Sequence, residues 1–197
     1  YPVALSIMKI CPALATGCTI VLKPSPGTVL DCYVVAEAAA EAGIPAGVIN
    51  WVPGGRELGA YLVSHPGIDK VSFTGSTEVG KGVAQTASAR LAHLSLELGG
   101  KNPSIVFPDA AAPDNIDSLL DGLLLSSRFA RQGQSCTAGS RLFLHQDIYD
   151  EVLGALSAKL GAMKVGDPLD EASDMGAIIN ASQFDSIAGY LSEGRES

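Results

Sequence analysis

Two separated segments of the sequence carry residues that could do covalent chemistry. Cys136 lies in the polar, glycine-containing segment 132–139 (QGQSCTAG). A thiol in such a turn can be reached and ionised, whereas a thiol inside an apolar helix cannot. Glu97 is a lone carboxylate between apolar residues, just before a glycine pair, in the segment 96–101 (LELGGK). Together they suggest a cysteine nucleophile with a separate carboxylate base.

The elements that would position Glu97 alternate regularly along the first half of the chain. Strands are predicted at 18–23, 48–52, 70–73 and 94–97, and helices at 5–15, 28–42, 56–64 and from 77 onward. We expect the first helix and the first strand to be mostly buried and Thr28 to cap the second helix. This order predicts a parallel sheet covered by helices on both faces.

A second alternation begins after Gly99 and Gly100. Strands are predicted at 104–107 and 140–144, and helices at 113–127, 149–160 and from about 181. Cys136 then falls in the loop before the second of these strands. No long linker is present, so we interpret the glycine pair as a crossing between two domains, residues 1–98 and 99–197.

Composition narrows the class of protein. The chain has 197 residues, 47% hydrophobic, and a formal net charge of -8. It can bury a sizeable core, and its acidity disfavours nucleic acid and anionic membranes as partners. No apolar run approaches the roughly 20 residues of a membrane span, and no signal peptide opens the chain. We therefore expect a cytoplasmic protein. The chain starts without Met, and both ends look cut from a longer protein.

Cysteine and histidine usage agrees with a reducing compartment and no metal. The four cysteines include no CxxC pair, and the three histidines show no metal-ligand spacing. We expect Cys11, Cys18 and Cys32, which lie in apolar surroundings, to be buried free thiols.

Three predicted strands end in residues that suit a ligand, because open parallel sheets bind ligands at that edge. These strand ends hold Lys23, the pair Gly54–Gly55, and Gly75–Ser76. Backbone N–H groups at the helix start after Gly75 can hold a phosphate. Gly82 stands where a P-loop needs Ser or Thr, which disfavours an NTPase. Taken singly, a solvated lysine, ordinary turn glycines and a purely structural turn remain alternatives.

Four segments resemble the NAD(P)-dependent aldehyde dehydrogenase superfamily, in the family's order: 20–25 (IVLKPS), 73–77 (FTGST), 96–101 (LELGGK) and 133–136 (GQSC). The resemblance runs through all 197 residues. It implies an α/β chain with a partial, Rossmann-like dinucleotide-binding domain at 1–98. The start of an α/β catalytic domain would follow at 99–197, giving an incomplete aldehyde dehydrogenase fold.

The resemblance also implies residue roles. Cys136 would be the nucleophile, and its backbone N–H would supply half of an oxyanion hole. Glu97 would be the base that activates water, and burial is expected to tune it for that task. Lys23 would bind the adenosine ribose of NAD or NADP, and Ser76 the pyrophosphate. The full set of implied cofactor contacts is Lys23, Ser25, Gly55, Gly59, Gly75, Ser76 and Leu98.

The implied reaction oxidises an aldehyde to a carboxylic acid through a thiohemiacetal and a thioester on Cys136. The parent protein would be a homodimer or homotetramer. The family's oxyanion asparagine would fall just before Tyr1, and its nicotinamide-ribose glutamate beyond Ser197, so the chain alone is expected to be inactive. Pro26 stands where many NAD-preferring members carry a glutamate, which leaves NAD and NADP both open. The sequence does not identify the aldehyde.

Two other classes stay in view. One is a cysteine hydrolase or acyl transferase that pairs Cys136 with a distant histidine, and it would show no nicotinamide dependence. The other is a dinucleotide-binding scaffold, in which Cys136 would not react with an aldehyde or an alkylating agent. The Glu97 and Cys136 segments argue against the scaffold, because binding a nucleotide needs neither.

Overall fold

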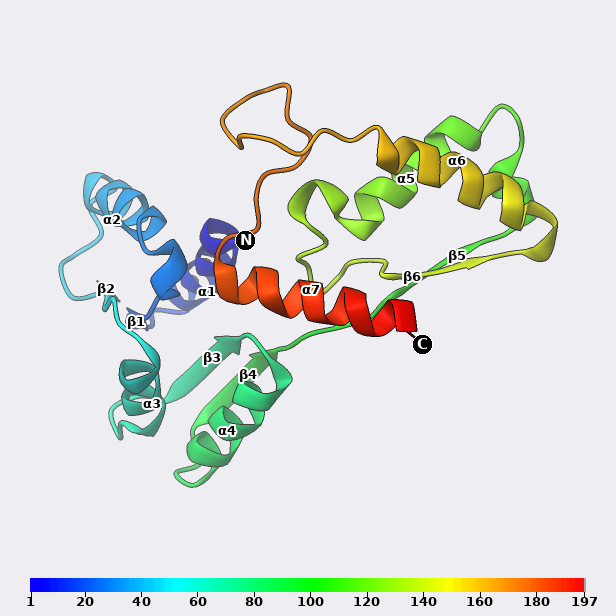
Figure 1. Ribbon diagram of the computed structural model, residues 1–197. Coiled ribbons are helices and arrows are strands. Elements are labelled where there is room, and N and C mark those ends of the chain that lie inside the picture. The colour runs from blue at the N-terminus through cyan, green and yellow to red at the C-terminus, as the bar shows by residue number, and fades with distance from the viewer. Residues whose placement is uncertain (197) are drawn as a thin grey trace. The chain divides into compact units, whose positions relative to one another are not determined.

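The computed structural model describes residues 1–196, which alternate between helices and strands (Figure 1). They form two compact units, and the second unit begins at Gly99. The boundary therefore falls at the glycine pair that follows Glu97. Among the described residues, the first unit holds two sheets and the second holds one.

The first unit holds two parallel strand pairs. β1 (Ile20–Leu22) pairs with β2 (Ile49–Trp51), and β3 (Lys70–Thr74) pairs with β4 (His93–Glu97). Parallel neighbours need a crossover between them, and helices supply it. α2 (Asp31–Glu41) connects β1 to β2, and α4 (Thr77–Ser88) connects β3 to β4. α1 (Pro2–Ala15) precedes β1, and α3 (Arg56–Ser64) lies between the two pairs along the chain. In the second pair, Thr74 lies opposite Glu97, so both residues end their strands at one edge.

Some expectations for the first unit are wrong. Thr28 does not cap α2: it ends a short 3-10 helix (Pro26–Thr28), and α2 begins only at Asp31. α1 buries only Ile10, and Val21 in β1 is 44% exposed. A two-stranded sheet is too narrow to cover the apolar surface of its helices, so much of that surface stays open. For the same reason Cys11 and Cys18 are exposed, and only Cys32 is the buried free thiol we expected.

The second unit places one parallel strand pair beneath two helices. β5 (Pro103–Val106) pairs with β6 (Arg141–Leu144), and Pro103 lies opposite Arg141. α5 (Ile116–Ser127) and α6 (Tyr149–Gly161) lie side by side in contact (Figure 1), and α7 (Ala181–Glu196) closes the described chain. Helix α5 starts three residues later than predicted from Pro113, with Asn115 as its N-cap.

The core of the second unit forms between α5, α6, the end of β5 and the short 3-10 turns that follow β5 and β6. Val152 on α6 is fully buried and lies at its centre. The other buried members of this cluster are Val106, Ala111, Leu120, Leu123, Ile148 and Leu156. This packing holds α5 and the strand pair together, and the loop that carries Cys136 connects α5 to β6.

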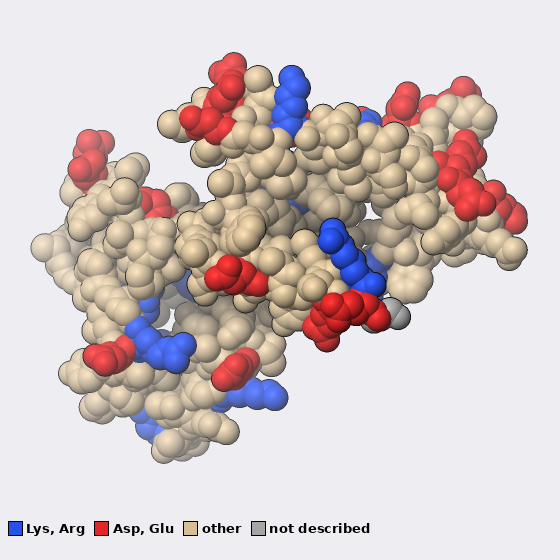
Figure 2. All heavy atoms as spheres, viewed as in Figure 1, with Lys and Arg blue, Asp and Glu red and all other residues tan. Residues whose placement is uncertain are grey.

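Charged side chains of both signs are scattered over a largely uncharged surface on the face shown in Figure 2. Within residues 1–196, no helix combines the length and the apolar character that crossing a membrane requires.

Candidate functional site

Cys136 sits on an exposed turn between α5 and β6. The N–H of Ala138 donates to the carbonyl of Ser135 over 3.2 Å and closes the turn. The Ser135 hydroxyl accepts from the N–H of Thr137 at 3.2 Å. The Cys136 thiol is free and exposed, as a reactive thiol requires. Among residues 1–196 the backbone N–H of Cys136 has no hydrogen-bond acceptor, so it is available to a ligand.

The turn rests on the start of β5. The Asn102 amide nitrogen donates to the carbonyl of Cys136 at 2.8 Å and to that of Ala138 at 3.3 Å. A Cβ atom at Gly100 would come within 2.6 Å of the Cys136 carbonyl oxygen. Sequence reasoning missed Asn102, because its only signal was its place two residues after the glycine pair.

Gly139 is held from the side of α5. The N–H of Gly139 donates to the carbonyl of Ser126 at 2.9 Å, and the Ser127 hydroxyl donates to the carbonyl of Gly139 at 3.2 Å. The thiol turn is therefore attached both to the sheet and to the helix before it.

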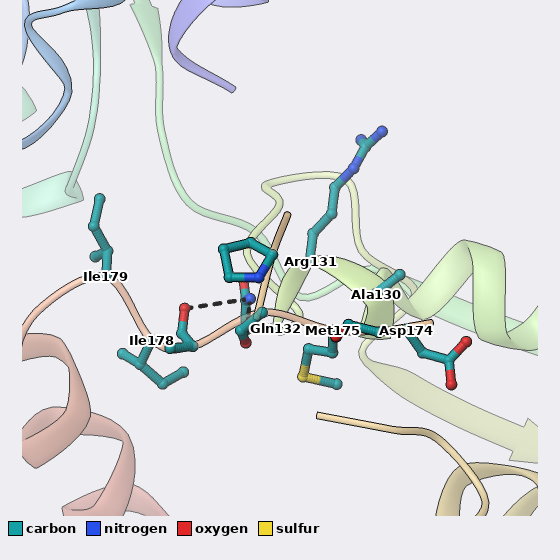
Figure 3. A pocket seen from close by; sticks show the side chains of 11 residues that line it. Ala130, Arg131, Gln132, Asp174, Met175, Ile178 and Ile179 are labelled. Carbon is teal, nitrogen blue, oxygen red and sulfur yellow. Dashed lines mark hydrogen bonds between the residues drawn. The ribbon is translucent and has the colours of Figure 1, made fainter. Parts of the chain in front are cut away.

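Gln132 holds the upstream arm of the turn. Its backbone is left-handed, with φ 53°, and its amide nitrogen donates to the carbonyl of Gly176 at 2.8 Å. A cavity of about 500 Å³ opens between this arm and the segment 168–179 (Figure 3). Cys136 is not among its lining residues, so this cavity lies at the base of the loop rather than at the thiol.

Glu97 ends β4 in the first unit. Its carbonyl accepts from the N–H of Gly75 at 3.1 Å, which joins the end of β4 to the turn that follows β3. Its side chain is exposed. The burial that we expected to tune Glu97 as a base is therefore not present within the described chain, because the strand ends at an open edge of a two-stranded sheet.

Lys9 reaches this edge from α1. Its Nζ donates to the Thr74 hydroxyl at 2.8 Å, opposite Glu97 in the strand register. Burial lowers the pKa of Lys9, and the nearby Glu97 charge opposes that shift. Sequence reasoning missed Lys9, whose only signal was a single cation in an apolar helix. The Lys9 ammonium thus lies within electrostatic reach of Glu97 in the first unit.

Lys23 forms the first group of candidate cofactor contacts. Its Nζ donates to the carbonyls of Pro24 and Gly54 at 2.7 and 3.2 Å. A Cβ at Gly59 would lie 3.4 Å from Cε of Lys23, so the bare helix surface makes room for the lysine. An ammonium has three donors, which leaves one N–H for a ligand.

Two exposed residues adjoin this group. Ser25 precedes the 3-10 helix and Gly55 precedes α3, each as the N-cap residue. Neither makes a side-chain cap hydrogen bond. Both are exposed and follow the carboxyl ends of β1 and β2, the edge where open α/β sheets bind ligands.

Gly75 and Ser76 form the second group. The Ser76 hydroxyl accepts from the N–H of Val79 at 3.3 Å and caps α4. A helix leaves its first N–H groups without internal acceptors, and its dipole favours an anion there. A Cβ at Gly75 would meet the Phe73 ring at 2.5 Å, so only glycine fits this turn unchanged. These features suit a pyrophosphate.

Leu98 packs against α4, the helix that follows Gly75 and Ser76. A Cβ at Gly80 would lie 2.6 Å from Cδ2 of Leu98, so this side chain packs directly on α4. No hydrogen bond links the Lys23 group to the Gly75–Ser76 group within the described part of the chain. Both groups belong to the first unit, and together they make up the candidate cofactor cradle.

Known proteins share both the sequence and the fold. Over residues 1–197 the sequence matches the family described as "Aldehyde dehydrogenase family". Geranial dehydrogenase from Castellaniella defragrans is 50% identical over 194 residues, covering 98% of this chain and 40% of that protein.

Solved structures agree. Gamma-glutamyl-gamma-aminobutyraldehyde dehydrogenase from Burkholderia cenocepacia J2315 superposes with a TM-score of 0.91 at 43% identity, covering 100% of this chain and 39% of its own. The NAD+ complex of an aldehyde dehydrogenase from Bacillus cereus gives a TM-score of 0.94 at 38% identity, with the same coverage of 100% and 39%.

These similarities confirm the predicted α/β aldehyde dehydrogenase fold. The chain belongs to the aldehyde dehydrogenase family. It spans about two fifths of the length of the relatives that it matches.

Proposed function

We propose that the protein to which this chain belongs oxidises an aldehyde to a carboxylic acid with NAD(P)+. The observation that carries the proposal is the exposed thiol of Cys136 on a turn whose own N–H has no acceptor within residues 1–196. Family membership supports the aldehyde as substrate class, and a solved relative in complex with NAD+ supports the cofactor.

Cys136 performs the covalent step. Its thiolate adds to the aldehyde carbonyl, and the carbonyl oxygen becomes an oxyanion that accepts from the Cys136 N–H. Removing one such donor typically slows catalysis by about 10²–10³-fold. When bound, NAD(P)+ supplies a two-electron acceptor for the substrate carbon, which leaves a thioester on Cys136.

Glu97 performs the second step. Its carboxylate takes a proton from water, and the resulting hydroxide attacks the thioester carbon, breaks the C–S bond and releases the acid and the Cys136 thiolate.

The first unit holds the cofactor. The free N–H of Lys23 donates to a ribose hydroxyl, and the first turn of α4 donates to the pyrophosphate. Gly75 lets the cofactor approach the backbone, Leu98 supports the turn, and Ser25, Gly55 and Gly59 line the sheet edge. Residues 1–98 are accordingly proposed as the dinucleotide-binding domain and 99–197 as the start of the catalytic domain.

We further propose that the parent is a cytoplasmic homodimer or homotetramer and that the 197-residue chain alone turns over no aldehyde. The relatives named above act on geranial and on gamma-glutamyl-gamma-aminobutyraldehyde. The substrate of this protein is therefore sought in a panel that includes terpenoid and amino aldehydes.

The test uses the full-length parent, that panel, and NAD+ and NADP+ in parallel. Wild type should form NAD(P)H with at least one aldehyde, and Cys136→Ala should form none. Glu97→Gln should release a single turnover of NAD(P)H and then stall, because acylation precedes the step that needs the base. Full turnover by Cys136→Ala would refute the assignment. Hydrolysis of esters without any nicotinamide would instead favour the cysteine hydrolase.

A further inference from the structure

The carbonyl of Cys136 is held by a side chain rather than by the backbone of its own turn. The turn closes through Ala138 and Ser135, which leaves the Cys136 carbonyl pointing at β5. There the Asn102 amide nitrogen donates to it at 2.8 Å. The same nitrogen donates to the carbonyl of Ala138 at 3.3 Å. One amide group therefore bridges two carbonyls on either side of Thr137.

Asn102 is itself anchored where β5 and β6 begin. Its carbonyl accepts from the N–H of Arg141 at 3.2 Å, directly before the first paired residues of the two strands. The Arg141 guanidinium donates from Nε to the carbonyl of Lys101 at 2.9 Å. The backbone that presents the Asn102 amide is thus fixed to the sheet, and the sheet carries the packed core of the second unit.

The two hydrogen bonds of the Asn102 side chain require an amide group, which neither a carboxylate nor a methyl group can replace. Its NH₂ group offers two donors, and both face carbonyl oxygens that can only accept. A carboxylate of the same shape would present oxygens to those carbonyls and repel them. A methyl group would leave both carbonyls without this donor.

We propose that Asn102 is a positioning residue for the nucleophile. By fixing the carbonyl of Cys136, it fixes the backbone of that residue, and with it the directions of the thiol and of the N–H that would meet the oxyanion. This proposal rests on the proposed function, because it concerns how Cys136 is aimed at an aldehyde. Asn102 acts through Cys136 and touches no reacting atom.

The test compares Asn102→Asp and Asn102→Ala with wild type in the full-length parent. Stopped-flow measurement gives the rate of NAD(P)H formation in the first turnover. We expect Asn102→Asp to lose on the order of 10²-fold, the effect of misplacing a reacting group by about 1 Å. Asn102→Ala should show a smaller loss in the same direction. Cofactor affinity should stay at the wild-type value, because the cradle lies in the first unit.

Asn50→Asp is the matched control. Asn50 also bridges two carbonyls with its amide nitrogen, those of Ile20 at 3.1 Å and Gly47 at 2.9 Å. The same substitution there removes the same kind of bridge in the first unit and should leave the first-turnover rate per folded enzyme unchanged.

Alkylation of Cys136 by iodoacetamide distinguishes a change in the orientation of the thiol from a loss of folded structure. Alkylation needs only an exposed thiol, whereas aldehyde oxidation also needs the thiol to be correctly oriented. The proposal expects alkylation to fall much less than aldehyde oxidation in both Asn102 variants. First-turnover rates equal to wild type in both would overturn it. So would equal losses of oxidation, alkylation and cofactor binding, which would indicate a purely structural role. Failure of the proposed function is distinct, because wild type itself would then oxidise no aldehyde.

Discussion

A methyl group on Gly100 would place its carbon 2.6 Å from the carbonyl oxygen of Cys136, whereas one on Gly99 would meet nothing within 4 Å. Gly99 and Gly100 therefore have different structural roles. Gly100 allows the thiol turn to rest against the start of β5, and Gly99 has no such neighbour. The close contact is with backbone, which cannot rotate out of the way as a flexible side chain can.

Gly100→Ala should therefore displace the thiol turn. Overpacking of this kind typically costs about 1–3 kcal/mol of stability. A shift of the nucleophile by about 1 Å can slow the reaction by about 10²-fold. Both effects can be measured in the full-length parent, by urea unfolding and by the first-turnover rate. Gly99→Ala is the control and should stay within about 0.5 kcal/mol of wild type. Equal effects of the two substitutions would show that the contact with Cys136 is unimportant.

The sequence pattern predicted the elements better than the contacts among them. The bounds of α3 and the end of β4 at Glu97 follow from local signals, because glycines and alternating apolar residues mark where strands and helices stop. The start of α2 was wrong, because the 3-10 turn after Pro26 delays the helix beyond Thr28.

Side-chain contacts across the fold left no such local signal. Lys9 is 65 positions from its partner Thr74, and Asn102 is 34 positions from Cys136. Lys9 meets Thr74 only after α1 has packed near the end of β3. Asn102 meets Cys136 only after the long loop before β6 has packed against the start of β5. The exposure of Glu97 also depends on packing, since an apolar pattern before a strand end does not reveal how wide the sheet will be.

Substitution of Ser76 should separate helix capping from cofactor binding. Ser76→Ala removes the acceptor for the N–H of Val79 and should cost about 1 kcal/mol of stability. Ser76→Asp keeps a capping oxygen, so stability should remain near that of wild type. Its negative charge would face the pyrophosphate, so cofactor affinity should fall further than in Ser76→Ala. Calorimetric titration of the parent with NAD+ and NADP+ measures this order.

The reverse order would contradict the placement of a phosphate at this helix start. If Ser76 serves only as a cap, the Asp variant binds the cofactor as wild type does and the Ala variant binds it slightly less well through loss of helix order. Ionic strength offers a further check, because repulsion between the new carboxylate and the pyrophosphate weakens as salt is added.

Lys9 should make stability depend on pH in a defined direction. Burial lowers the pKa of Lys9 in the folded chain, outweighing the opposing effect of Glu97. The unfolded state then binds more protons than the folded state between the lowered pKa and the ordinary lysine value of about 10.4. Below this window Lys9 is charged in both states, and the cost of burying the charge is fully present.

As pH rises through the window, folded Lys9 loses its proton first and this cost disappears. The free energy of unfolding of wild type should therefore rise relative to that of Lys9→Met. Urea unfolding of the full-length parent, as wild type and as Lys9→Met, measures both free energies of unfolding at about pH 7 and at about pH 10. Lys81→Met, on the exposed surface of α4, controls for the loss of a cation elsewhere in the first unit. A free energy of unfolding of wild type that stays constant or falls relative to that of Lys9→Met as pH rises would show that burial does not govern the ionisation of Lys9.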